Sequence, residues 1–236
     1  MLHSLKEDVY WANMEIFNHK LALYTWGNAS GIDRESGVVA IKPSGLVYEE
    51  LTPEQIALVR LDDGKLLEGD LKPSSDTPAH LELYRSFPRI GGIVHTHSPH
   101  ATAWAQAVEA IPCYGTTHAD HFYGSVPVTA PLTKEEIEGD YEAAAGRSIA
   151  RLFREKGLDA SAMPGALCAC HGPFTWGPTP EKAVYNAVVL EETARIALMT
   201  RSINPDTPEI SSALLDRHFL RKHGPQAYYG QEAHNG

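Results

Sequence analysis

GGIVHTHSPHATAW, residues 91–104, joins an apolar strand pattern to a helix start and decides how the fold is interpreted. An Ile-Val pair behind two glycines is typical of a buried strand. A Ser-Pro dipeptide then supplies a helix cap and a first helical residue. Because side chains alternate along a strand, His95 and His97 are expected on one face, about 6–7 Å apart at the backbone. The stretch therefore predicts a strand edge that presents two imidazoles.

Strand and helix patterns are mixed along the rest of the chain without a regular β-α-β rhythm. Helices are expected near residues 4–20, 77–87, 99–108, 135–156, 179–200 and 211–222. Short apolar strands bounded by turn residues lie between them, including GALCACHG at residues 165–172. No linker, repeat or low-complexity segment divides the 236 residues, so we predict one α/β domain over residues 1–236. Its mixed sheet is expected to carry helices on its faces.

The charge balance of the chain excludes several classes of function. The 20 Lys and Arg residues and 30 Asp and Glu residues give a formal net charge of −10, which disfavours binding to nucleic acid or anionic lipid. No apolar run approaches the ~20 residues of a membrane span, and the N-terminus lacks a signal-peptide pattern. Cys113, Cys168 and Cys170 do not form a disulfide framework. We expect a cytoplasmic protein with no nucleic-acid or membrane partner.

A third histidine makes a metal site the stronger interpretation of the paired imidazoles. Taken alone, His95 and His97 are more often ordinary hydrogen-bonded histidines than metal ligands. His171 ends the second apolar strand, and strand alternation places it on the face opposite Cys168 and Cys170. Those cysteines are therefore expected to be small buried apolar residues rather than ligands. Three histidines with open coordination positions are the arrangement of a catalytic zinc ion.

Two Lys-Pro-Ser turns, in IKPSG (residues 41–45) and KPSSDTPAH (residues 72–80), predict an anion site. Serine hydroxyls, a lysine charge and the backbone of a glycine or of a helix N-terminus all bind phosphate. The candidate residues are Lys42, Ser44, Gly45, Ser74 and Ser75. Asp76 precedes a helix with Pro78 just inside it, so an N-cap role is the alternative for this residue. Together the turns are expected to cradle a phosphate monoester despite the acidic total charge.

Taken together, these motifs resemble the class II aldolase/adducin superfamily and, within it, the L-ribulose-5-phosphate 4-epimerases. The segments that carry the resemblance are TWGNASG, IKPSG, KPSSDTPAHLELY, IGGIVHTHSPHATAWAQ, GTTHADHFYG, HGPFTWG, NAVVLEETA and LLDRHFLRKHGPQAYYGQ. HTH and HG are typical of the whole superfamily. HADHFYG and RKHGPQAYYGQ are narrower and indicate the epimerases rather than the fuculose-phosphate aldolases. The resemblance covers nearly the whole chain in order.

The resemblance implies a fold, an assembly and a metal. The fold would be a central, largely antiparallel mixed sheet flanked by helices on both faces. The assembly would be a C4 homotetramer with active sites between subunits, and residues 224–236 would form an irregular tail that reaches a neighbouring subunit. The metal would be zinc, with manganese and cobalt as alternatives. The implied metal ligands are Asp76, His95, His97 and His171.

The same resemblance implies the reaction and its residues. The substrate would be a small sugar phosphate, with L-ribulose 5-phosphate and D-xylulose 5-phosphate interconverted by breaking and re-forming the C3–C4 bond. Asp120 and a neighbouring subunit's Tyr229 would be the acid/base pair, although local sequence favours a loop cap and a tail aromatic. The implied substrate and phosphate residues are Gly27, Asn28, Lys42, Ser44, Gly45, Ser74 and Ser75. Thr116, Glu142 and His218 are expected as neighbours of the site.

Three other interpretations compete with the epimerase. A class II aldolase would share the metal and phosphate sites but release its two products. A non-catalytic adducin-like scaffold would not need the full set of histidines, which is intact here. A structural zinc domain would have four closed ligands, most of them cysteines.

Overall fold

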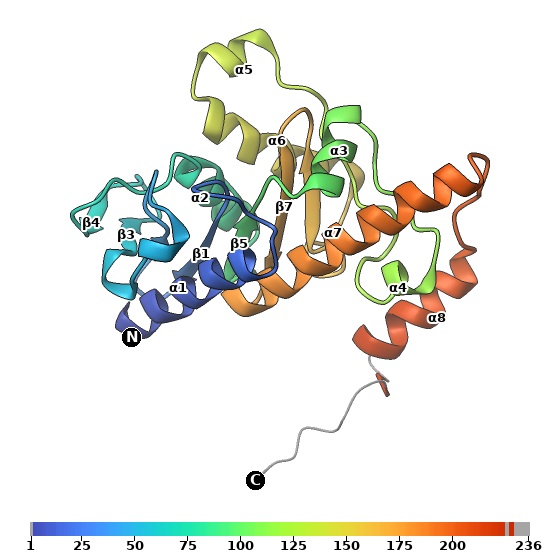
Figure 1. Ribbon diagram of the computed structural model, residues 1–236, viewed down its shortest axis with the longest axis horizontal. Coiled ribbons are helices and arrows are strands. Elements are labelled where there is room, and N and C mark those ends of the chain that lie inside the picture. The colour runs from blue at the N-terminus through green and yellow to red at the C-terminus, as the bar shows by residue number, and fades with distance from the viewer. Residues whose placement is uncertain (1, 225–226, 229–236) are drawn as a thin grey trace.

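A seven-stranded sheet runs through the computed structural model, which describes residues 2–224 and 227–228 (Figure 1). The strands are β1 (Asn28–Asp33), β2 (Val38–Ile41), β3 (Ala57–Arg60), β4 (Leu66–Glu68), β5 (Gly92–His95), β6 (Gly165–Cys168) and β7 (Gly172–Gly177). Their order is β4-β3-β2-β1-β5-β7-β6, and every neighbouring pair is antiparallel. Parallel pairing within the described residues is limited to one isolated bridge between Val128 and Leu167. The expected sheet is therefore confirmed.

Helices cover both faces of the sheet, as predicted. They are α1 (Leu2–Asn18), α2 (Thr77–Ser86), α3 (Pro99–Ala107), α4 (Thr116–Ala119), α5 (Lys134–Glu138), α6 (Tyr141–Lys156), α7 (Pro180–Ile203) and α8 (Ser212–His223). On one face, Val94 packs with Ala12 of α1 and with α7. On the other face, Ile93 packs with Tyr84 of α2 and Phe153 of α6. Adjacent residues of β5 thus belong to different core clusters, because strand side chains alternate.

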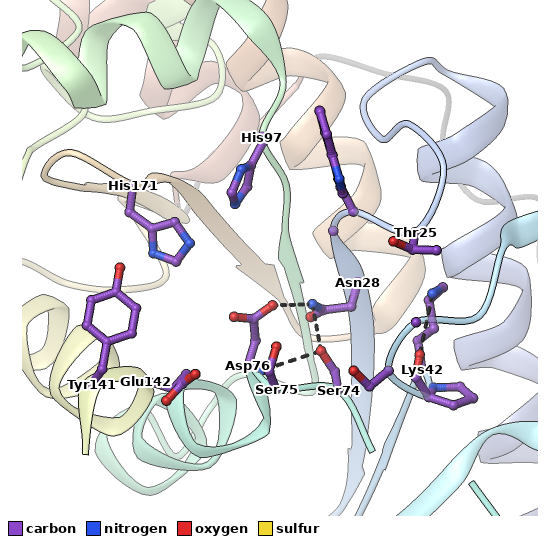
Figure 2. A pocket seen from close by; sticks show the side chains of 15 residues that line it. Thr25, Asn28, Lys42, Ser74, Ser75, Asp76, His97, Tyr141, Glu142 and His171 are labelled. Carbon is purple, nitrogen blue, oxygen red and sulfur yellow. Dashed lines mark hydrogen bonds between the residues drawn. The ribbon is translucent and has the colours of Figure 1, made fainter. Parts of the chain in front are cut away.

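The single helix predicted over residues 135–156 is wrong, because the chain forms α5 and α6 there. Thr133 caps α5 in a reciprocal capping box with Glu136. Asp140 caps α6 by accepting a hydrogen bond from the amide of Ala143. Two caps seven residues apart start two helices, and Gly139 ends the first. The break places the first turn of α6 over the end of the sheet that carries the histidines (Figure 2).

Gly146 allows α6 to approach α2 closely. A Cβ atom at Gly146 would lie 2.6 Å from the carbonyl oxygen of Ala79 in α2, a distance that real side chains do not adopt. The contact brings the N-terminal ends of both helices to the same region, where Figure 2 shows Asp76 and Glu142 facing one cavity. No helix in the described part of the chain is long and apolar enough to span a membrane.

Candidate functional site

Three histidines meet at one end of the sheet, where β5 ends beside the β6–β7 turn. His95 is the last residue of β5, His97 follows two residues later, and His171 lies just before β7. One nitrogen from each of the three rings lies within 4.8 Å of the others. The Nε2 atoms of His95 and His97 are 3.2 Å apart. The structure therefore brings together the three histidines that the sequence proposed as ligands.

His171 reaches the group from a tight turn rather than from a strand. β6 ends at Cys168, and Cys170 adopts a left-handed conformation with φ of 60°. The strand alternation used to separate His171 from the cysteines therefore does not extend to residue 171. Cys168 is buried, as expected, whereas Cys170 is exposed. A Cβ atom at Gly172 would lie 2.7 Å from the carbonyl oxygen of Thr96, so glycine is needed for the turn to approach β5.

The chemistry of the three rings fits a metal ion. His95 Nδ1 lies 3.0 Å from the carbonyl oxygen of Pro173, which accepts its proton and leaves a lone pair on Nε2. His171 Nδ1 is buried and has no hydrogen-bond partner in the described chain. Burial lowers the pKa of His95 to about 3, and burial also lowers the pKa values of His97 and His171. Neutral imidazoles with inward lone pairs are the metal-binding form of histidine.

Asp76 lies beside the histidines but outside the 4.8 Å group. Although it precedes α2, its side chain makes no cap hydrogen bond. Its carboxylate instead accepts a hydrogen bond of 2.6 Å from Asn28 Nδ2 (Figure 2). Burial alone would raise the pKa of Asp76, but its electrostatic interaction with the neighbouring His95 and His80 and the Asn28 hydrogen bond lower it overall. Asp76 therefore occupies the N-cap position of α2, but its carboxylate is bonded to Asn28 and faces the cavity instead of capping the helix.

A cavity of about 590 Å³ joins the histidines to the two Lys-Pro-Ser turns (Figure 2). It is lined by Thr25, Trp26, Gly27, Asn28, Lys42, Pro43, Ser44, Gly45, Ser74, Ser75, Asp76, His97, Tyr141, Glu142 and His171. The two turns pair through backbone hydrogen bonds of 2.9 Å, from Ser44 N to the Lys72 carbonyl and from Ser74 N to the Lys42 carbonyl. These two amides are already bonded, so an anion would meet mainly the serine hydroxyls and the Gly45 backbone.

Lys42 gives the end of the cavity formed by the Lys-Pro-Ser turns a buried positive charge. Its side chain is only 1% exposed, and its ammonium donates hydrogen bonds to the carbonyl oxygens of Leu46 and Pro43. It also lies 4.8 Å from the centre of the Tyr48 ring. Burial lowers the pKa of Lys42 to about 8, so the lysine is charged at neutral pH and sensitive to mild alkali.

Several lining residues were not singled out from the sequence. Tyr141 opens α6 next to Glu142, and Trp26 lies beside His97 with ring centres 6.5 Å apart. The cap signal at Asp140 could have located Tyr141 in a first helical turn. No signal in the sequence shows that this turn lies opposite the histidines, because that depends on the packing of α6 against α2.

Asp120 lies in a different group, which we call the α4–α8 cluster: Asp120, His218, Arg221, Lys222 and His223. Arg221 donates hydrogen bonds to both carboxylate oxygens of Asp120, and His218 adds a third contact at 3.1 Å. Burial would raise the pKa of Asp120, but hydrogen bonds from Arg221 and His218 and the Lys222 charge lower it overall. Asp120, Thr116 and His218 do not line the cavity of their own chain, and Tyr229 lies outside the described residues.

Residues 7–198 match the class II aldolase and adducin N-terminal domain. The chain belongs to the class II aldolase and adducin family. The matched region includes all three histidines, both Lys-Pro-Ser turns and the first turn of α6. It ends before α8, so the C-terminal half of the α4–α8 cluster lies beyond it.

Solved structures from this family share the fold over most of their length. An L-fuculose 1-phosphate aldolase matches with a TM-score of 0.78 and 22% identity over 93% of this chain and 96% of its own. YgbL from Escherichia coli, described as an aldolase/epimerase/decarboxylase, matches with a TM-score of 0.71 and 26% identity over 91% of this chain and 97% of its own. L-fuculose-1-phosphate aldolase from Thermus thermophilus matches with a TM-score of 0.66 and 28% identity over 87% of this chain and 98% of its own. At 22% identity, the likeness to the first of these structures concerns the fold alone.

Proposed function

We propose that this chain is a cytoplasmic, metal-dependent epimerase that interconverts L-ribulose 5-phosphate and D-xylulose 5-phosphate. One observation carries the proposal: a single cavity is lined at one end by His97 and His171, beside which the buried His95 completes the group of three, and at the other by paired serine turns with a buried lysine. That polarity suits a substrate with a ketone at one end and a phosphate at the other. The resemblance of HADHFYG and RKHGPQAYYGQ to epimerases supplies the choice of reaction.

Carbon–carbon cleavage explains why inversion at C4 needs such a cavity. C4 is β to the ketone, so removing its hydrogen would leave a carbanion that no carbonyl stabilises. When a base instead takes the proton of the C4 hydroxyl, C4 becomes an aldehyde and the C3–C4 bonding electrons pass to C3. The products are the enediolate of dihydroxyacetone and glycolaldehyde phosphate. After the aldehyde rotates, the enediolate attacks its other face, and an acid returns the proton to the C4 oxygen.

Residues of this chain would divide that chemistry between the two ends of the cavity. His95, His97 and His171 would hold a zinc ion, with manganese or cobalt as alternatives and Asp76 beside it. When bound, the ion supplies positive charge that stabilises developing negative charge on oxygen, a contribution of several kcal/mol. The phosphate residues would hold glycolaldehyde phosphate between cleavage and re-addition, so that recombination stays effectively intramolecular. The phosphate residues proposed are Gly27, Asn28, Lys42, Ser44, Gly45, Ser74 and Ser75.

The proton transfers are proposed to need a second subunit. Asp120 does not line the cavity of its own chain, and its lowered pKa makes it a carboxylate at neutral pH. In a C4 homotetramer the α4–α8 cluster would face a neighbour's cavity and bring Asp120, Thr116, His218 and Tyr229 to it. Asp120 and Tyr229 would then act on opposite faces of the aldehyde. Glu142 already lines the cavity from within the chain.

A sugar-phosphate aldolase is the second candidate, because two of the matched structures are L-fuculose 1-phosphate aldolases. It would use the same metal and phosphate ends but release the aldehyde. An adducin-like scaffold has less support, since a non-catalytic protein has no need for three converging neutral imidazoles.

A coupled assay with L-ribulose 5-phosphate tests the proposal. We expect the purified protein to form D-xylulose 5-phosphate, and we expect that activity to be lost with a chelator and in His97→Asn. Free glycolaldehyde phosphate should stay a minor product. Its stoichiometric release would favour the aldolase, and full epimerase activity with chelator present would exclude the metal mechanism.

A further inference from the structure

Tyr141 places a phenol at the histidine end of the cavity, where no role has been assigned to it. Figure 2 shows its hydroxyl directed toward His171, and the centres of the two rings are 6.1 Å apart. The side chain is 37% exposed, so the ring packs on the wall of the cavity while part of it stays open to a ligand. A hydroxyl in this position can contact a substrate that binds at the histidine end of the cavity.

The position of Tyr141 is set by a helix rather than by a loop. It is the first residue of α6, which Asp140 caps. The absence of a side chain at Gly146 lets that helix lie against Ala79 of α2. Groups held by packed helices keep their geometry better than groups on loops, so the phenol is a pre-positioned group.

The chemistry of the hydroxyl suits donation rather than proton removal. No described residue forms a hydrogen bond with the Tyr141 hydroxyl, so its proton is available to a ligand. A tyrosine phenol has an ordinary pKa of about 10. The phenol is therefore neutral at physiological pH. Glu142, its neighbour in α6, only accepts hydrogen bonds when ionised.

We propose that the Tyr141 hydroxyl donates a hydrogen bond to the enediolate oxygen that gains negative charge as the C3–C4 bond breaks. With the phosphate at the paired serine turns, the ketone half of the substrate lies at the end of the cavity where Tyr141 and His171 face each other. A donor aimed at an oxygen whose charge develops during the reaction stabilises the transition state more than the substrate. No proton is transferred, and no bond to Tyr141 forms.

The inference rests on the proposed function only in requiring an enediolate, which the epimerase and the aldolase share. Tyr141 would thus be a catalytic residue in either reaction. The test therefore includes a binding measurement that needs no turnover. Its probe is glycolohydroxamate, a planar anion with the shape and charge distribution of the dihydroxyacetone enediolate.

The experiment compares Tyr141→Phe with the wild type and with Tyr10→Phe, a control at a partly buried tyrosine of α1 outside the cavity. For the zinc-loaded Tyr141→Phe protein, calorimetry should show glycolohydroxamate binding about 10–100-fold weaker, as expected for loss of a hydrogen bond to a charged acceptor. Affinity for inorganic phosphate and zinc content should be unchanged. In the coupled assay, kcat should fall about 10–100-fold with KM within ~3-fold. Tyr10→Phe should match the wild type in every measurement.

Two results would overturn the inference: hydroxamate binding by Tyr141→Phe that equals the wild type, or parallel losses of phosphate affinity and zinc content, which would indicate a structural role. A third result separates the two proposals. If Tyr141→Phe weakens hydroxamate binding but the wild type does not convert L-ribulose 5-phosphate, the proposed substrate is wrong and this inference stands.

Discussion

The cavity and the α4–α8 cluster both bury polar groups, but they differ in how those groups are satisfied. In the cluster, Asp120 pairs with the cations of Arg221 and Lys222 and accepts a hydrogen bond from His218. In the cavity, His171 Nδ1 and Asn28 Oδ1 are buried without a partner. Buried polar groups are costly when unpaired, so a fold retains them where a ligand completes the bonding. The comparison indicates that polar groups of the cavity need a ligand to complete their bonding, whereas the Asp120 carboxylate already has its partners within one chain.

The largest expected effect comes from removing one imidazole of the cavity. We expect His171→Ala to lose zinc on dialysis and to lower kcat/KM about 10³-fold or more, because the remaining two ligands hold a metal poorly. Metal analysis and the coupled assay check this. His19→Ala, at an exposed histidine of the α1 C-terminal turn, should retain zinc and activity. A fully active, metal-free His171→Ala protein would contradict the view that the histidines of the cavity need a metal ion.

Gly172 tests whether the cavity depends on close backbone approach. Gly172→Ala would place a methyl group 2.7 Å from the Thr96 carbonyl oxygen. Because backbone must move on both sides, we expect about 2–3 kcal/mol of destabilisation and at least tenfold weaker zinc binding. Gly115→Ala is the control, since nothing lies within 4 Å of its added methyl. Urea unfolding of both apo-proteins measures the difference, and equal midpoints would show that the turn tolerates a side chain.

Asp120 tests the completeness of the α4–α8 cluster. Asp120→Asn should reduce the free energy of unfolding by about 2 kcal/mol, because Arg221 would lose its charged partner. A double-mutant cycle with Arg221→Leu should give a coupling free energy of about 1–3 kcal/mol. Lys42→Met, by contrast, should change the free energy of unfolding by less than about 1 kcal/mol. The substitution removes the hydrogen bonds of the ammonium, but it also removes the cost of burying a charge. Equal losses in the two regions would contradict the comparison.

The smallest expected effect is a pH dependence of phosphate affinity. Lys42 carries its charge below its pKa of about 8 and loses it as the pH rises through that value. A phosphate monoester with a second pKa near 6 is already a dianion in this range, so only the lysine changes. We expect KM to rise about three- to tenfold between pH 7 and pH 9. In Lys42→Met, KM should start high and stay flat, and a parallel rise in that variant would assign the titration elsewhere.

Much of the site followed from local patterns. The period of two along β5 put His95 on the face of Ile93, and the apolar stretch that ends at His171 supplied the third histidine. Proline and capping residues located the starts of α3 and α7. The helix break at Gly139 was missed, because the helix-forming residues on both sides of Gly139 and Asp140 favour one long helix.

The roles of single acidic residues did not follow from local patterns. Asp76 has the sequence of an N-cap, yet its side chain bonds to Asn28, which is 48 positions away in the chain. Asp120 has the sequence of a loop residue, yet its partners lie about a hundred positions further on in α8. A carboxylate takes whichever donors the packed chain brings nearest, and sequence spacing does not encode those distances.

The sequence by itself determined the sheet with its flanking helices, the three imidazoles and the two serine turns, since each depends on periodicity or on turn chemistry within a few residues. Only the tertiary structure decided that the turns pair with each other, that Tyr141 faces His171, and that Asp120 bonds to residues of α8 and does not line the cavity of its own chain. These relations arise from the packing of α6 on α2 and of α8 on α4. Packing of that kind depends on side-chain shape across the whole core, and no short stretch of the chain contains it.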